Sequence, residues 1–163
     1  MQRLAVLLAT LLLTGTVFAA PEYPLMGPDI YDPKADGTPQ IASALAQATT
    51  GNKRVLLVFG ANWCIWCRRL HATFADEPTV ARALRAGFEI VLVDVNTRNG
   101  TKRNADVNTR YGNPIANGLP VLVVLDAAGK KLTTQDTGAL EDGAKHSPEK
   151  IRAFLAEWAP RPR

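Results

Sequence analysis

The stretch Trp63-Cys64-Ile65-Trp66-Cys67 contains both cysteines of this 163-residue chain. The apolar run 55–59 precedes it and predicts a strand, and the segment 68–74 behind it predicts a helix. Two cysteines three positions apart lie on the same side of a first helical turn. They are then within reach of a disulfide, whose Cα atoms lie roughly 4.4–6.8 Å apart. A strand, a tight turn and a Cys-x-x-Cys that opens a helix therefore indicate a redox site.

Cys64 is the candidate nucleophile of this pair. At the start of a helix it meets unpaired backbone N–H groups and the positive end of the helix dipole. Both favour the thiolate, and in such motifs the cysteine pKa falls from about 8.5 to roughly 3.5–7.5. Cys67 shares one stripe of the helix with Leu70 and Phe74, which should face the core. Cys67 is therefore the candidate resolving thiol.

Composition indicates one globular domain. The chain is long enough to bury a hydrophobic core. Its net charge is +4, but the basic residues are scattered along the sequence. No basic stripe with interleaved aromatic residues is present, so we expect no nucleic-acid partner.

Residues 1–19 have the pattern of a cleavable signal peptide. Arg3 is the only charge, the run 4–13 is nearly all apolar, and 17–19 has the small-x-small form of a cleavage site. The apolar run is shorter than the about 20 residues of a membrane span, so an uncleaved anchor is the weaker alternative. The sequence therefore predicts export to the periplasm. A disulfide across Cys64 and Cys67 would close a very small loop and constrain the unfolded chain little, so reactivity explains the pair better than a structural role.

The rest of the chain predicts an α/β domain over 38–159, with an irregular, extended arm over 20–37 and a short tail over 160–163. Thr38 is expected to cap the first helix. Periodicity and breakers predict helices over 38–51, 64–74, 79–86, 102–111 and 148–158, and strands over 54–59, 88–95, 121–125 and 130–137. Because helix joins the first two strands, they should be parallel.

The chain resembles the thioredoxin superfamily over about residues 38–158. The resemblance is carried by 63–67 after the apolar strand, by Tyr111-Gly112, and by Gly118-Leu119-Pro120-Val121 before the third strand. It is similar to exported thioredoxin-like domains, including the C-terminal domain of DsbD-type reductases, whose active-site helix also runs into a segment like 73–76. The resemblance implies a thioredoxin fold, with a central mixed four-stranded sheet flanked by helices and here an extra N-terminal helix.

The resemblance also implies a site around a redox disulfide between Cys64 and Cys67. It implies a cis peptide bond at Leu119–Pro120 that faces the cysteines and leaves backbone groups open to an extended substrate. The positive charge of Arg68, one turn below Cys64, is expected to help hold the thiolate. The residues expected to bind substrate are Trp63, Ile65, Trp66, Gly118, Leu119 and Pro120.

Two positions depart from the thioredoxin pattern. Val58 stands where thioredoxins usually carry a buried aspartate that assists proton removal from the resolving thiol. The dipeptide Ile65-Trp66 between the cysteines is neither Gly-Pro nor Pro-His, and this dipeptide helps to set the redox potential. The absence of a histidine there argues against a strong oxidant.

These observations predict a protein-disulfide reductase that needs no cofactor. Its expected partners are disulfide-containing proteins and a membrane electron donor of DsbD type, and the expected state is a monomer. The alternatives are a disulfide-donating oxidant and a thioredoxin-fold binding module that holds clients or handles metal without turnover. Cys64, Cys67 and His71 fall on one helical face, but a structural zinc site needs four ligands. The only other histidine, His146, is expected in a distant loop, so no metal is predicted.

Overall fold

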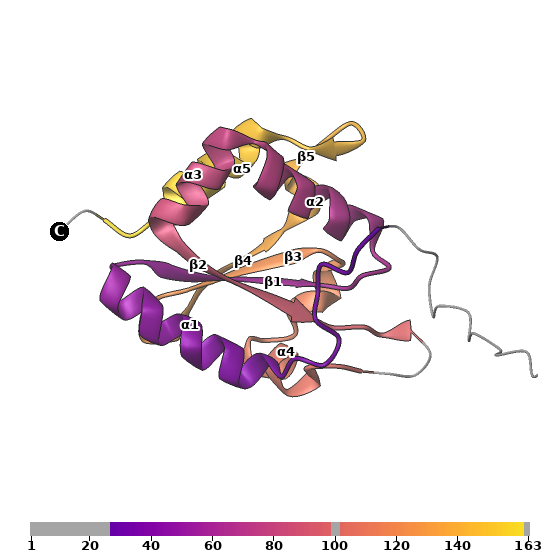
Figure 1. Cartoon of the computed structure of the whole chain (residues 1–163), viewed down its shortest axis with the longest axis horizontal. Coiled ribbons are helices and arrows are strands. Elements are labelled where there is room, and N and C mark those ends of the chain that lie inside the picture. Colours follow the sequence, from indigo (N-terminus) through magenta and orange to yellow (C-terminus); the bar gives the residue numbers. More distant parts are fainter. Residues whose placement is uncertain (1–26, 99–101, 162–163) are drawn as a thin grey trace, which may run out of the picture.

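Four strands form a mixed sheet at the centre of the computed structural model, which describes residues 27–98 and 102–161. Their order in the sheet is β2 (Phe88–Asp94), β1 (Arg54–Gly60), β3 (Val121–Leu125) and β4 (Lys131–Asp136). β1 pairs with β2 in parallel and with β3 antiparallel, and β4 pairs antiparallel with β3 (Figure 1). The predicted mixed four-stranded sheet is therefore confirmed.

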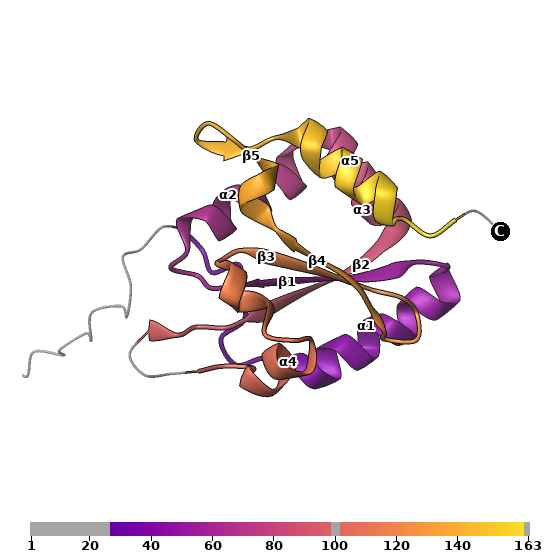
Figure 2. The same ribbon diagram turned by 180° about the vertical axis from the view of Figure 1, so that it is seen from behind.

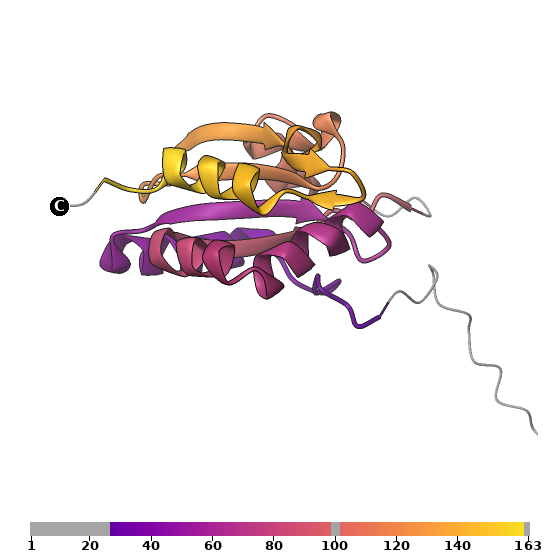
Figure 3. The same cartoon turned by 90° about the horizontal axis from the view of Figure 1, so that it is seen from above.

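Helices cover both faces of this sheet. The extra N-terminal helix α1 (Gly37–Gly51) and the short helix α4 (Ala105–Arg110) lie on one face (Figures 1 and 2). The other face carries α2 (Ile65–Asp76), α3 (Pro78–Gly87) and α5 (Pro148–Trp158). Figure 3 shows α3 and α5 side by side along that face. The fold is thus a sheet between two helical layers, as the thioredoxin resemblance implies.

The central strand β1 contributes to both hydrophobic cores because its side chains alternate between the two faces. Val55, Leu57 and Phe59 pack into the core beneath α1, whereas Leu56 and Val58 pack into the core beneath α2 and α5. All five side chains are buried. The uninterrupted apolar run in the sequence is therefore the signature of a strand covered on both faces.

Several local predictions need correction. Asp36, not Thr38, caps α1: its side chain accepts the N–H of Thr38, and the helix begins at Gly37. The helix expected over 102–111 is limited to α4, because Asn104 before it has left-handed backbone angles. The polar linkers also form elements that periodicity did not predict, namely η2 (Pro114–Asn117), η3 (Thr137–Leu140), β5 (Glu141–Asp142) and β6 (Lys145–His146).

The described part of the N-terminal arm, residues 27–36, is bound to the loop that follows β1. The Asn62 side-chain oxygen accepts the N–H groups of Ile30 and Tyr31, each at 2.9 Å, and its amide nitrogen donates to the Tyr31 carbonyl at 2.9 Å. Arg68 adds a bond from Nη1 to the Pro28 carbonyl at 2.9 Å. The arm therefore belongs to the same packed unit as the cysteine loop.

The predicted signal peptide over 1–19, the start of the arm over 20–26 and the last two residues of the tail lie outside the described residues. Within 27–98 and 102–161, no helix is long and apolar enough to cross a membrane.

Replacing Asn62 by alanine should destabilise the fold, because it removes three hydrogen bonds and leaves two backbone N–H groups of the arm without their acceptor. We expect the free energy of unfolding in urea to fall by about 1–3 kcal/mol. Gln47→Ala removes an exposed carboxamide with one hydrogen bond to Ser43 and is the matched control. It should change stability by less than about 0.5 kcal/mol. If the two variants lose the same stability, Asn62 does not hold the arm.

Candidate active site

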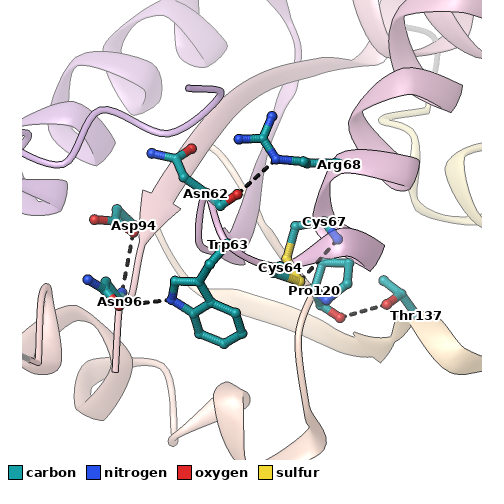
Figure 4. Close-up of a disulfide and its surroundings, with 9 residues drawn as sticks. All are labelled: Asn62, Trp63, Cys64, Cys67, Arg68, Asp94, Asn96, Pro120 and Thr137. Carbon is teal, nitrogen blue, oxygen red and sulfur yellow. Dashed lines mark hydrogen bonds between the residues drawn. A yellow bond between two sulfur atoms is a disulfide. The ribbon is translucent and has the colours of Figure 1, made fainter. Parts of the chain in front are cut away.

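Cys64 and Cys67 form a disulfide at the first turn of α2, with their Cα atoms 5.2 Å apart (Figure 4). Cys64 is the N-cap of the helix, and its sulfur accepts the backbone N–H of Cys67 at 3.1 Å. Cys64 is 6% exposed and Cys67 only 1%. Of the two sulfur-bearing residues, Cys64 is thus the one nearer to solvent and the one placed at the positive end of the helix.

A tight turn after β1 creates this placement. The N–H of Cys64 donates to the Ala61 carbonyl at 3.0 Å, and the N–H of Arg68 then donates to the Cys64 carbonyl at 3.1 Å. The first bond reverses the chain at the end of the strand, and the second closes the first turn of α2. The free N–H groups of a helix start favour a negative charge, so the Cys64 sulfur is placed where a thiolate is stabilised.

Gly60 is the last residue of β1 and has a steric role. A Cβ atom at this position would come within 3.0 Å of both the Tyr31 hydroxyl group and the Cys67 sulfur. The tyrosine ring from the arm and the buried cysteine therefore share a small space that exists because residue 60 has no side chain. Tyr31, Cys64 and Cys67 form one buried cluster.

A polar network behind the disulfide orients Trp63. The indole Nε1 donates to the Asn96 side-chain oxygen at 2.8 Å, and the Arg98 guanidinium carbon lies 4.1 Å from the ring centroid. The Asn96 backbone N–H donates to Asp94, whose other carboxylate oxygen pairs with Arg103 at 2.8 Å. Sequence reasoning assigned Asp94 no function. The sequence feature that could have indicated a role for Asp94 is its position as a charged residue directly at the end of the apolar strand β2.

The two residues between the cysteines have different environments. Ile65 is 46% exposed. Trp66 is half-buried, with the Arg69 guanidinium carbon 4.5 Å from its ring centroid and the His146 ring in an edge-to-face contact at 5.6 Å. Ile65 therefore lies open to a partner, and Trp66 is held by packing.

The prediction that His146 lies in a distant loop was wrong. His146 is in β6, which packs against α2, and its side chain is fully buried. Burial, and secondarily the charge of Arg69, lower the pKa of His146 to about 4, so the ring is neutral at pH 7. The sequence between β4 and α5 has no periodic pattern that indicates such a return to the site.

The segment before β3 faces the disulfide from the other side. The Leu119–Pro120 peptide bond is cis, and Figure 4 shows the proline ring beside the two sulfurs. The Thr137 hydroxyl donates to the Pro120 carbonyl at 2.6 Å, and Leu119 packs against the cluster of Tyr31 and the cysteines. Gly118 is exposed, and no atom lies within 4 Å of the place where its Cβ would be. This edge of the site is therefore open.

Arg68 binds backbone carbonyls. Its Nε donates to the Asn62 carbonyl at 2.8 Å and its Nη1 to Pro28, and Figure 4 shows the guanidinium directed away from the sulfurs. Its role in holding the thiolate stays a prediction. Among residues 27–98 and 102–161, no group of three or more His, Cys, Asp or Glu side chains is placed to hold a metal ion, and this includes Cys64, Cys67 and His71.

A disulfide that opens a helix next to a cis-proline, on a mixed sheet between two helical layers, defines a thioredoxin-fold protein. A family model described as thioredoxin-like matches residues 36–127, and the chain belongs to this family. A comparison with curated protein sequences gives no match.

Solved structures agree with this assignment. The chain is 35% identical to a disulphide isomerase from Xylella fastidiosa, with 85% of this chain and 98% of the other covered and a TM-score of 0.68. The C-terminal domain of DsbD from Neisseria meningitidis, in the oxidised form, is 23% identical, with 76% and 97% covered and a TM-score of 0.53. A thioredoxin from Thermus thermophilus is 24% identical, with 71% and 81% covered and a TM-score of 0.51. The last two likenesses concern the fold.

Gly60→Ala tests whether this packing requires a residue without a side chain. The added methyl group would overlap the Tyr31 hydroxyl and the Cys67 sulfur, so we expect thermal or urea unfolding to show a loss of about 1–3 kcal/mol. Gly51→Ala is the control, because its Cβ would make an ordinary 3.5 Å contact with the Lys53 side chain. That variant should be unchanged or stabilised by up to about 1 kcal/mol. A Gly60→Ala protein as stable as wild type would show that the space is not tight.

Proposed function

We propose that the protein is an exported thiol–disulfide oxidoreductase that reduces protein disulfides through Cys64 and Cys67. The observation that carries this proposal is the position of Cys64 as the N-cap of α2, with its sulfur accepting a backbone N–H. That environment favours the thiolate, which is the attacking species in disulfide exchange. The more deeply buried Cys67 lies within disulfide distance of it.

The reaction starts from the reduced pair. The Cys64 thiolate attacks one sulfur of a substrate disulfide, a mixed disulfide forms, and the other substrate sulfur leaves as a thiolate that takes up a proton. Cys67 then attacks the Cys64 sulfur. The Cys64–Cys67 disulfide forms, the second substrate sulfur leaves and is protonated, and two electrons have passed from the protein to the substrate. The disulfide state described above is the product of this half-reaction.

An extended substrate segment fits the open edge between the α2 start and the segment before β3. Ile65, Trp63 and Trp66 supply an apolar rim on one side, and Gly118, Leu119 and Pro120 form the other. Backbone groups beside a cis-proline are open to pair with an extended chain, and apolar contacts add affinity around the reacting sulfurs. Arg68 would contribute a long-range positive charge to the thiolate.

An oxidised protein must regain two electrons after each cycle. The amino-terminal segment with the pattern of a signal peptide supports a periplasmic location, where thiols are not kept reduced by cytosolic systems. A reductase there needs a donor, and we propose a membrane electron carrier of DsbD type. Thiol chemistry requires no cofactor, and we propose that the monomer is the working unit.

Two cysteine variants test the assignment of roles. Cys64→Ser should abolish the reduction of insulin disulfides by the purified protein, because the attacking sulfur is gone. Cys67→Ser should keep the attack but accumulate mixed disulfides with substrate proteins, visible as adducts that disappear with dithiothreitol. If the Cys64→Ser variant still reduces insulin, the assignment of Cys64 as the nucleophile is refuted. If the Cys67→Ser variant forms no adduct, the resolving role of Cys67 is refuted.

Disulfide isomerisation is the second candidate, favoured by the 35% identity to a protein described as a disulphide isomerase. The reduction potential of the Cys64–Cys67 pair distinguishes the candidates when the protein is equilibrated with glutathione or dithiothreitol. A reductase should have a reduction potential of about −270 mV, the value of thioredoxin. An isomerase should have a potential of about −180 mV, and a disulfide-donating oxidant a potential of about −120 mV. A protein without a reversible dithiol couple would instead be a binding module.

A further inference from the structure

Tyr31 places a hydroxyl group beside the sulfur of Cys67. The side chain is only 2% exposed, and its backbone is bound on both sides by Asn62. The hydroxyl oxygen and the Cys67 sulfur are neighbours over Gly60, because each lies within 3.0 Å of the place where a Cβ of residue 60 would be. Tyr31 therefore belongs to the reactive centre although it lies more than thirty residues before Cys64 in the sequence.

Cys67 can attack only if its thiolate is stabilised. A thiol must lose its proton to attack, and burial disfavours the charged form. Cys67 is almost completely buried, and its own backbone N–H is directed to the Cys64 sulfur. Val58, on the strand beneath α2, is apolar and contributes no polar hydrogen. A thiolate at Cys67 thus requires a donor from elsewhere in the fold.

The Asp94 carboxylate, which lies opposite Gly60 in the sheet, is already engaged. Asp94 accepts hydrogen bonds from Arg103 and from the Asn96 backbone. Arg68 on α2 donates to two carbonyls through Nε and Nη1, and its buried Nη2 makes no hydrogen bond to the described residues, but the guanidinium is directed away from the sulfurs (Figure 4). The Tyr31 hydroxyl, by contrast, lies next to the Cys67 sulfur over Gly60. Its hydrogen is therefore available when the disulfide opens and charge develops on the neighbouring sulfur.

We propose that the Tyr31 hydroxyl donates a hydrogen bond to the Cys67 thiolate and so promotes the step in which Cys67 resolves the mixed disulfide. This proposal rests on the thiol–disulfide function proposed above. In the step, the Cys67 S–H bond breaks, a sulfur–sulfur bond to Cys64 forms, and the bond from Cys64 to the substrate sulfur breaks. The departing substrate sulfur takes the proton, and Tyr31 keeps its own.

The protonation state of Tyr31 agrees with a donor role. Burial, and secondarily the negative charge of Asp94, raise the pKa of Tyr31 above its ordinary value of 10.0. The side chain is therefore a neutral donor at every pH at which thiol exchange is measured.

Reaction of the reduced protein with dithiobis(nitrobenzoate), followed by stopped-flow absorbance, separates the two sulfurs. Cys64 releases a first nitrothiobenzoate and holds the second as a mixed disulfide, which Cys67 then releases. A hydrogen bond to a charged group corresponds to about one to two pKa units. Part of the loss in thiolate is offset, because nucleophilicity rises with pKa with a Brønsted slope of about 0.4–0.5. Tyr31→Phe should therefore slow the second phase by about 3- to 10-fold and leave the first phase unchanged.

Tyr111→Phe is the matched control, since Tyr111 is a buried tyrosine in the core beneath α1. It should leave both phases unchanged. An unaltered second phase in Tyr31→Phe would overturn the proposal, as would equal slowing in both variants. A wild-type protein that releases no second equivalent would instead refute the proposed dithiol function.

A direct measurement on Cys67 keeps the test independent of rates. In Cys64→Ser, the pKa of the Cys67 thiol can be read from the NMR shift of its Cβ atom. Adding Tyr31→Phe should raise this pKa by about one to two units. The two proteins share the same charged neighbours, namely Asp94, its partner Arg103, and Arg68. A difference in the pKa of the Cys67 thiol is therefore due to the Tyr31 hydroxyl. An unchanged pKa would overturn the proposal.

Discussion

The burial of β1 on both faces determines where everything else in this protein lies. A slip of one residue in an apolar strand covered by helices on each side would move every side chain into the opposite core, so the packing of the two cores fixes its end point. That end is Gly60, and the next turn delivers Cys64 to the start of α2. The parallel neighbour β2 ends opposite it, with Gly60 paired to Asp94. The same edge of the sheet therefore carries the disulfide and the polar network that orients Trp63.

The absence of a side chain at Gly60 is the second constraint. It lets the chain bring an aromatic ring from the N-terminal arm and a cysteine from α2 to the same point above the sheet. The arm is not an appendage of the domain, because Asn62 and Arg68 bind it through hydrogen bonds from the cysteine loop and from the helix behind it. Substitutions in the arm are thus expected to act on the redox centre as well as on stability.

Much of this architecture could be predicted from the sequence, and the parts that could not have a common cause. The run 55–59 and the apolar stripes of the helices carry a local signal, since burial imposes a period of two or 3.6 residues. Tyr31 and His146 carry no such signal: each lies in a segment without a periodic pattern, and its position depends on contacts made far along the chain. The sequence therefore predicted the wrong position for His146 and gave no indication of the Tyr31 hydroxyl at the site. Asp36 took the capping position expected for Thr38 because either residue type caps a helix well, and the choice depends on tertiary packing.

The two cysteine sulfurs have different surroundings, which come from different parts of the chain. The fold can therefore tune the stability of the two thiolates separately. Cys64 depends on the backbone of α2, whose N–H groups are present in any helix and are insensitive to the identity of nearby side chains. Cys67 is buried behind it, and its proposed reactivity depends on the side chain that fills the space over Gly60. An apolar residue at position 58 removes the acidic group that the thioredoxin pattern places beneath α2, and a tyrosine from the arm brings a neutral polar group to the same sulfur from another direction. A neutral donor stabilises a thiolate without adding a negative charge next to Asp94, so this arrangement is electrostatically compatible with the ion pair that holds the network behind Trp63.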